Sequence, residues 1–195
     1  MRTLKQVKLV FASLLILVLT TQIVVAQTYH LDNETSSLKI DGTSNLHDWQ
    51  IVAENQQGTL VADFEDGKLS EIKQLDFTVT AESLKSGKSA MDKNTYKALD
   101  TKEYKQIVFK LNDVNSINCA ANSCKVSATG DLTIAGTTKP INITFTMEIG
   151  ASKISLTGTK NIKMTDFNVD PPKALFGTIT TGDAIDVIFQ SSFKK

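Results

Sequence analysis

The stretch that decides the fold is Ile141-Asn142-Ile143-Thr144-Phe145-Thr146-Met147-Glu148-Ile149, in which every odd-numbered residue is apolar and every even-numbered residue is polar. Successive side chains of a β-strand point to opposite faces, so this pattern predicts a strand with one buried face. The alternation recurs, in places less regularly, in residues 60–64, 75–79, 107–111 and 185–189. The sequence therefore predicts a predominantly β protein.

Short turn-forming stretches separate these segments. They are rich in Gly, Asn, Asp and Pro and cover residues 55–58, 66–67, 129–131, 136–140 and 181–183. Such short connections favour antiparallel neighbours and indicate eight or nine strands. A sheet of this size must close on itself or pack against a second sheet to cover its apolar face. Periodicity alone leaves a barrel and a sandwich open.

One helical segment is expected within the β pattern, over residues 89–99. Ser89 followed by Asp92 resembles a capping box, and Met91, Ala98 and Leu99 share one helix face. The lysines around this segment have two interpretations. They either hold an anionic head group at the mouth of a cavity or form the solvated face of a surface helix. These lysines are Lys85, Lys88, Lys93, Lys97, Lys102 and Lys105.

Length and charge limit the classes of protein that the chain can represent. Its 195 residues suit one domain. Apolar residues make up 41% and charged residues 22%, which excludes a disordered tail and a polytopic membrane protein. Lys plus Arg and Asp plus Glu number 21 each, so net charge gives no argument for a nucleic-acid partner.

Residues 1–26 are expected to be a secretory signal peptide rather than part of the fold. Arg2, Lys5 and Lys8 precede an apolar run over residues 9–19, and Ala26 suits signal peptidase cleavage. A retained membrane anchor is the alternative, but a spanning helix needs roughly 20 apolar residues. We therefore expect a mature domain over residues 27–195 that is periplasmic or secreted, with no stable membrane span after cleavage.

The two cysteines, Cys119 and Cys124, flank a small, polar, turn-forming tetrapeptide between two strand-like stretches. In an oxidising compartment such a pair usually forms a disulfide, here at a hairpin tip. Free thiols are the alternative. A structural zinc site takes four ligands and no other cysteine exists, so no metal is expected.

Candidates for catalysis are few. The histidines, His30 and His47, lie in no recognised catalytic motif. His47 next to Asp48 suggests a base or a metal ligand, but adjacent strand residues point to opposite faces. We expect a structural or ligand-contacting His47, no enzymatic activity and no cofactor.

Three groups of residues carry a resemblance to a known family. Tyr29-His30-Leu31-Asp32 and Gly42-Thr43-Ser44-Asn45-Leu46-His47-Asp48-Trp49 resemble the opening of the YceI-like family of exported polyisoprenoid-binding proteins. Gly130-Asp131-Leu132-Thr133-Ile134-Ala135-Gly136-Thr137-Thr138-Lys139-Pro140 is similar to its most distinctive motif, and residues 164–169 and 182–187 to its closing strands. The resemblance covers nearly all of the chain after residue 26, in the expected order.

This resemblance implies an all-β, elongated, antiparallel eight-stranded barrel of lipocalin-like type, with an apolar tunnel for an isoprenoid or other long-chain lipid. The implied function is non-catalytic lipid binding. The alternative is an envelope-stress or interaction protein whose barrel is filled by its own side chains. The oligomeric state stays open, a homodimer included. The residues expected to line the cavity are Trp49, Phe64, Phe77, Tyr96, Tyr104, Ile107, Phe109, Phe145 and Met147.

Overall fold

The computed structural model describes residues 25–65 and 67–195, most of which lie in β-strands. The strands are β1 Val25–Leu31, β2 Ser37–Ser44, β3 Trp49–Ala53, β4 Gln56–Glu65, β5 Lys68–Thr80, β6 Leu84–Lys85, β7 Gln106–Ala120, β8 Ser123–Ile134, β9 Thr137–Ile149, β10 Lys153–Lys163, β11 Lys173–Ala174 and β12 Ile179–Lys194. Helix α2 spans Ser89–Ala98, and short 3-10 turns occupy η2 Asn33–Thr35, η3 Ala81–Ser83, η4 Met164–Phe167 and η5 Leu175–Gly177.

The expected signal peptide lies almost entirely outside the described residues. Its last two residues, Val25 and Ala26, are the first two of β1 and pair with Phe64 and Asp63 of β4. Cleavage after Ala26 would therefore shorten β1 from its amino end and leave the pairs from Gln27 onward. Within the described part of the chain, no helix is long and apolar enough to cross a membrane.

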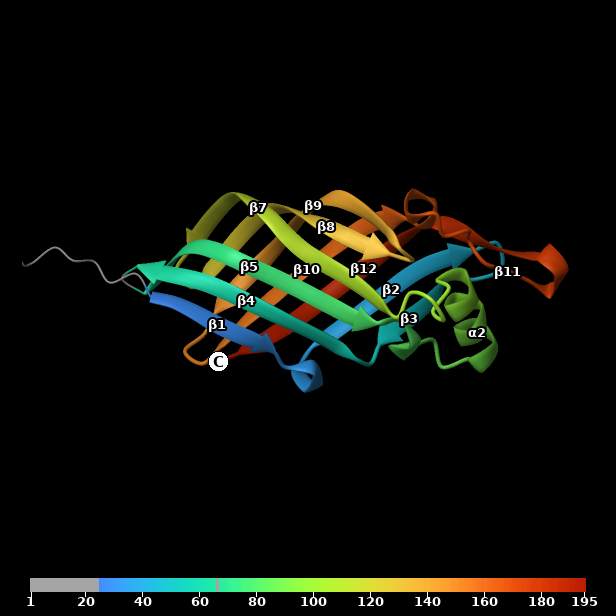
Figure 1. Cartoon of the computed structure of the whole chain (residues 1–195), viewed down its shortest axis with the longest axis horizontal. Coiled ribbons are helices and arrows are strands. Elements are labelled where there is room, and N and C mark those ends of the chain that lie inside the picture. The colour runs from blue at the N-terminus through green and yellow to red at the C-terminus, as the bar shows by residue number, and fades with distance from the viewer. Residues whose placement is uncertain (1–24, 66) are drawn as a thin grey trace, which may run out of the picture.

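Eight strands close into an antiparallel barrel in the order β1-β4-β5-β7-β8-β9-β10-β12. The barrel is long, with its strands running obliquely along the long axis (Figure 1). It closes where β12 meets β1, through the pairs Lys194 with His30 and Phe193 with Leu31. The predicted lipocalin-like barrel with a helical insertion is thus confirmed, and closure decides between barrel and sandwich.

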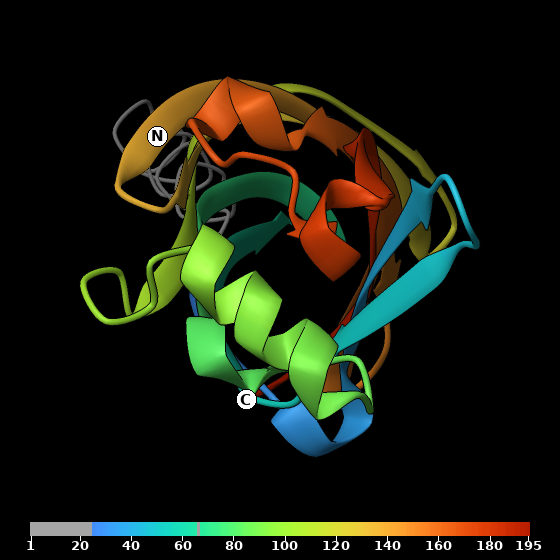
Figure 2. The same cartoon turned by 90° about the vertical axis from the view of Figure 1, so that its right-hand side faces the viewer.

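At one end of the barrel the wall is built differently. There β2 takes the place of β1 beside β12, pairing from Gln190 to Thr181, and β3 pairs with β2. The short β6 extends β3 by two residue pairs. Helix α2 then lies across this end of the barrel, opposite η4 and β11 (Figure 2). The helix therefore covers part of an opening that the strands leave.

The helix begins at the predicted residue, but the predicted capping box is wrong. Lys88 occupies the N-cap position and makes no side-chain cap. Asp92 instead accepts hydrogen bonds from the backbone nitrogen and hydroxyl of Ser86, at 2.8 and 2.6 Å. The carboxylate therefore stabilises the loop before the helix, and these hydrogen bonds hold the pKa of Asp92 below its ordinary value.

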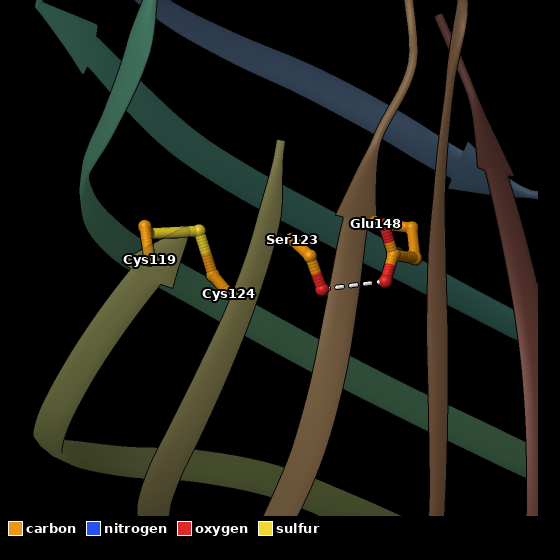
Figure 3. The surroundings of a disulfide bond; sticks show 4 residues. All are labelled: Cys119, Ser123, Cys124 and Glu148. Atoms are coloured by element: carbon orange, nitrogen blue, oxygen red, sulfur yellow. Dashed lines mark hydrogen bonds between the residues drawn. A yellow bond between two sulfur atoms is a disulfide. The ribbon is translucent and has the colours of Figure 1, made fainter. Parts of the chain in front are cut away.

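Cys119 and Cys124 form the predicted disulfide. They are directly opposed in the β7–β8 hairpin, at the end of the barrel away from α2. Cys124 is buried and Cys119 is exposed. Next to the disulfide, the Ser123 hydroxyl donates to Glu148 at 2.6 Å and joins the hairpin to β9 (Figure 3).

Reducing this disulfide is expected to lower the free energy of unfolding by about 2 kcal/mol and to leave the barrel folded, because a short closed loop restricts the unfolded chain little. Urea unfolding with and without reductant measures the difference. The double variant Cys119→Ser, Cys124→Ala should match the reduced protein. Two reactive thiols in the unfolded, unreduced protein would contradict the disulfide itself.

Candidate functional site

The interior of the barrel is divided into a filled half and an open half. The filled half holds side chains with essentially no exposure, Leu60, Met147, Ile154 and Phe193 among them. The open half, at the α2 end, is a cavity of about 460 Å³. This volume lies in the range of small-ligand pockets.

Aliphatic and aromatic side chains make up most of the cavity lining. Those at its floor, Leu75, Phe145, Leu156 and Phe193, also belong to the filled half. Further lining side chains come from β2, β3, β7, β9, β10 and β12: Leu38, Ile40, Trp49, Ile51, Ile107, Phe109, Ile141, Ile143, Ile162, Ile185, Val187 and Phe189. An apolar surface of this kind suits apolar groups, because their burial removes hydrocarbon surface from water.

Aromatic rings packed over glycines help to keep the cavity open. The Trp49 ring covers Gly42, its partner in the β2–β3 ladder. In the same way Phe189 covers Gly158, where an added Cβ would lie 2.6 Å from the ring carbon Cζ. The absent side chains let these rings lie close to the wall, which leaves more of the interior unfilled.

Helix α2 contributes its apolar face to the cavity. Met91, Ala98 and Leu99, predicted to share a face, all line it. Across the opening, Met164 and Phe167 of η4 line the cavity as well. Lys88 and His47 lie at the edge on the side of α2 and β3, and Lys173 lies on the side of β11. The mouth therefore combines apolar side chains of α2 and η4 with a few polar side chains at its edge.

The structure places five of the residues expected at the site around the cavity: Trp49, Phe77, Ile107, Phe109 and Phe145. Phe64 and Met147 do not line it, which corrects that expectation. Both point into the barrel as the alternation predicts, but Met147 is fully buried in the filled half and Phe64 packs against the same cluster. Alternation determines the face of a residue but not its height along the barrel.

Tyr96 and Tyr104 also do not line the cavity. The Tyr96 hydroxyl accepts a hydrogen bond from Lys85 Nζ at 2.6 Å and lies 2.9 Å from the Glu82 carbonyl oxygen, so it ties α2 to η3 and β6. The contact with Tyr96 raises the pKa of Lys85 above its ordinary value. Tyr104 is exposed and its ring packs over Gly136 in the β8–β9 turn. Both rings have structural contacts away from the lumen.

Sequence reasoning missed several polar residues that line the cavity, and Lys160 of β10 and Ser191 of β12 are the two that lie within regular strand alternation. The alternation of inward-facing and outward-facing residues along β10 and β12 could have identified both. Lys160 lies an even number of residues from Leu156 and Ile162, and Ser191 lies two residues from Phe189. Both are therefore on the inward face of their strands.

His47 shows no arrangement specific to catalysis or metal binding. Its Nδ1 atom lies 2.8 Å from the backbone oxygen of Asp48, and the ring is exposed at the mouth. His30 is exposed on β1. Among the residues that the structure describes, no group of three or more His, Cys, Asp or Glu side chains could hold a metal ion.

A carboxylate ties η4 to β12 at the mouth. Asp183 accepts hydrogen bonds from the backbone nitrogen of Thr165 at 2.9 Å and from its hydroxyl at 2.7 Å. These bonds hold the pKa of Asp183 below its ordinary value. A carboxyl group with a lower pKa when folded stabilises the protein above its unfolded pKa, and this contribution is lost as the pH falls through the folded pKa.

Acidification below about pH 4 is therefore expected to weaken the attachment of η4. The variant Asp183→Asn removes this titration, so the Tm difference between wild type and D183N should shrink as the pH falls below about 4. Thermal unfolding of both proteins between pH 7 and pH 3 measures it. A Tm difference independent of pH would contradict a role for the Asp183 charge.

Comparisons with known proteins agree with this architecture. The model of the YceI-like domain matches residues 29–193. Comparison with curated proteins finds no match. Among solved structures, the chain is similar to BcnA of Burkholderia cenocepacia, with a TM-score of 0.64 and 19% identity over 83% of this chain and 98% of that one.

Two further structures share the fold. A polyisoprenoid binding domain from Saccharophagus degradans, implicated in plant cell wall breakdown, has a TM-score of 0.67 and 13% identity over 85% of this chain and 97% of that one. A YceI protein of Campylobacter jejuni has a TM-score of 0.53 and 22% identity over 74% of this chain and 84% of that one. At these identities the likeness shows the common barrel.

Proposed function

The chain belongs to the YceI-like family, and we propose that it is an exported, non-catalytic protein that binds the hydrocarbon chain of an amphipathic lipid, of isoprenoid or similar type, in its barrel. The observation that carries this proposal is the cavity of about 460 Å³ beneath α2, with its mostly apolar lining. The likeness to the polyisoprenoid binding domain from Saccharophagus degradans supports the ligand class.

The energetics of such a site depend on chain length. Burying a methylene group contributes about 0.8 kcal/mol, so a five-carbon isoprenoid unit contributes roughly 4 kcal/mol before the costs of ordering. Burial of the hydrocarbon chain alone can therefore supply the affinity, and no polar contact is needed at the cavity floor. A chain too long for the cavity would extend out past α2, where the opening lies.

Export is the second part of the proposal. It is supported by the basic and apolar pattern of residues 1–26 and by the disulfide between Cys119 and Cys124, because disulfides persist in oxidising compartments. The filled-barrel alternative is less well supported, since only one half of the barrel is filled by its own side chains.

Mass spectrometry of lipids extracted from the protein purified from its own host tests the proposal directly. We expect a co-purified prenyl or other long-chain lipid at near-stoichiometric amount. Trp49, the single tryptophan, lines the cavity, so its fluorescence should change when delipidated protein is titrated with the recovered lipid. An empty protein whose Trp49 fluorescence responds to no lipid would support the interaction-protein alternative.

A further inference from the structure

Lys160 brings a positive charge to the lumen side of the barrel wall. The inward-facing residues Leu156 and Ile162 of β10 are buried, and Lys160 shares their face because it lies an even number of residues from each. It is also directly opposite Val187 of β12. Opposed residues of an antiparallel pair share a face, and both residues line the cavity.

No carboxylate in the described part of the chain pairs with Lys160. The ion pairs found there join Lys73 to Asp63 and Lys194 to Asp32. The lumen neighbours of Lys160 are aliphatic: Ile162 on its own strand and Val187 opposite. Lys160 is half-buried, so its ammonium group loses part of its hydration, and an anion or hydrogen-bond acceptors would offset that loss. A ligand with an anionic group would supply that partner.

The charges around the cavity are all of one sign. Over residues 25–65 and 67–195, its charged lining residues are three lysines, Lys88, Lys160 and Lys173, with no Asp or Glu. The whole chain, by contrast, has 21 basic and 21 acidic residues. A cleft lined by one sign of charge with apolar walls concentrates ligands of the opposite sign. The cavity therefore favours anions although the chain as a whole does not.

The height of Lys160 in the barrel fixes the orientation of such a ligand. β10 continues for three residues beyond it to Lys163, a distance of about 10 Å along the strand. In the other direction Leu156, at the floor, is four residues or about 13 Å away. A head group beside Lys160 thus lies inside the mouth, with apolar surface below it for a hydrocarbon chain.

We infer that the cavity binds single-chain amphiphiles with an anionic head, a carboxylate or a phosphate, and that Lys160 pairs with that head. This inference rests on the proposed lipid-binding function and adds the head-group class and the residue that selects it. Lys88 and Lys173 at the mouth attract the anion, and the chain lies against Phe145 and Phe193 at the floor. Ammonium groups bind both kinds of head through charge-assisted hydrogen bonds.

Titrations of the delipidated protein, followed by Trp49 fluorescence, test the inference with two matched pairs of probes. Oleate is compared with oleyl alcohol, and farnesyl phosphate with farnesol, so that each pair differs only in the head. We expect at least tenfold tighter binding of one or both anions, since a hydrogen bond to a charged group contributes about that much. The pair with the larger preference distinguishes a fatty-acid ligand from a prenyl-phosphate ligand.

The variant Lys160→Met keeps the apolar stem and removes the charge. It should bind anion and alcohol about equally, because the ammonium group that distinguishes the two heads is absent. Lys160→Arg should keep the preference. The control Lys153→Met, at an exposed position of the same strand, should behave as wild type.

Equal binding of anion and alcohol by the wild type overturns the inference and leaves the proposed function standing. A preference that survives in Lys160→Met but is lost in Lys88→Met, Lys173→Met overturns the role of Lys160. Failure of the wild type to bind any of the four probes, or any recovered lipid, overturns the proposed function as well.

Discussion

Replacing Ile143 with tryptophan is expected to lower lipid occupancy at least tenfold while the barrel still folds. Ile143 lines the cavity from β9 and is only half-buried, and its partner on β8 is the small residue Ala128. The larger ring would occupy space that is empty in the free protein. It would therefore avoid most of the roughly 1–3 kcal/mol that extra atoms cost in a filled core. Lipid extracted per mole of purified protein measures occupancy, and circular dichroism checks the fold.

The matched control is Thr144→Trp, which places the same ring on the exposed outer face of the same strand. It should retain the wild-type amount of lipid. Phe145→Trp would be a poor test, because Phe145 is 3% exposed and packs in the filled half, so the larger ring would strain the core. Unchanged lipid in a folded Ile143→Trp protein would show that the chain does not lie in this cavity.

The alternation in residues 141–149 predicted correctly which side chains of β9 point inward, but not where the cavity ends. Ile143 and Met147 share the inward face, yet Ile143 lines the cavity and Met147 is fully buried. The difference depends on what other strands place at each height. Met147 pairs with Cys124 of β8 and Leu156 of β10, both buried, whereas β9 makes no ladder with β10 beside Ile143. The height at which the cavity ends therefore depends on the whole closed barrel and cannot be predicted from the sequence of one strand.

The polar residues show a second limit of sequence reasoning. Six lysines near α2 stand out as a cluster, yet of these only Lys88 lines the cavity. Lys160 lies on the inward face of β10, which the alternation of that strand indicates more directly than clustering does for the lysines near α2. A single lysine among apolar residues, however, forms no recognisable motif. Tyr96 has the amphipathic ring that suits a mouth, but its hydroxyl is engaged by Lys85 and the backbone of η3. Local chemistry identified the types of residue, and the fold determined which of them meet.

Replacing Phe193 with alanine is expected to lower the free energy of unfolding by about 3–5 kcal/mol, the usual cost of removing a buried phenylalanine ring. Phe193 is fully buried in the filled half. It pairs with Ile154 of β10 on one side and with Leu31 of β1 on the other, at the junction where the barrel closes. The lost ring would leave a void between strands that are already fixed by their ladders, so little of the space can collapse. Urea unfolding followed by circular dichroism measures the loss.

The matched control is Ile188→Ala on the same strand. Ile188 is 36% exposed and lies on the outer face, so its truncation should cost less than about 1 kcal/mol. Phe193 also forms part of the cavity floor, so the Phe193→Ala variant tests the size of the cavity as well as the stability of the filled half. Loss of the ring joins new space to the cavity, so a folded Phe193→Ala protein should accept a longer hydrocarbon chain than wild type. A cost as small as that of Ile188→Ala would mean that the closure of the barrel between β1 and β12 does not depend on this side chain.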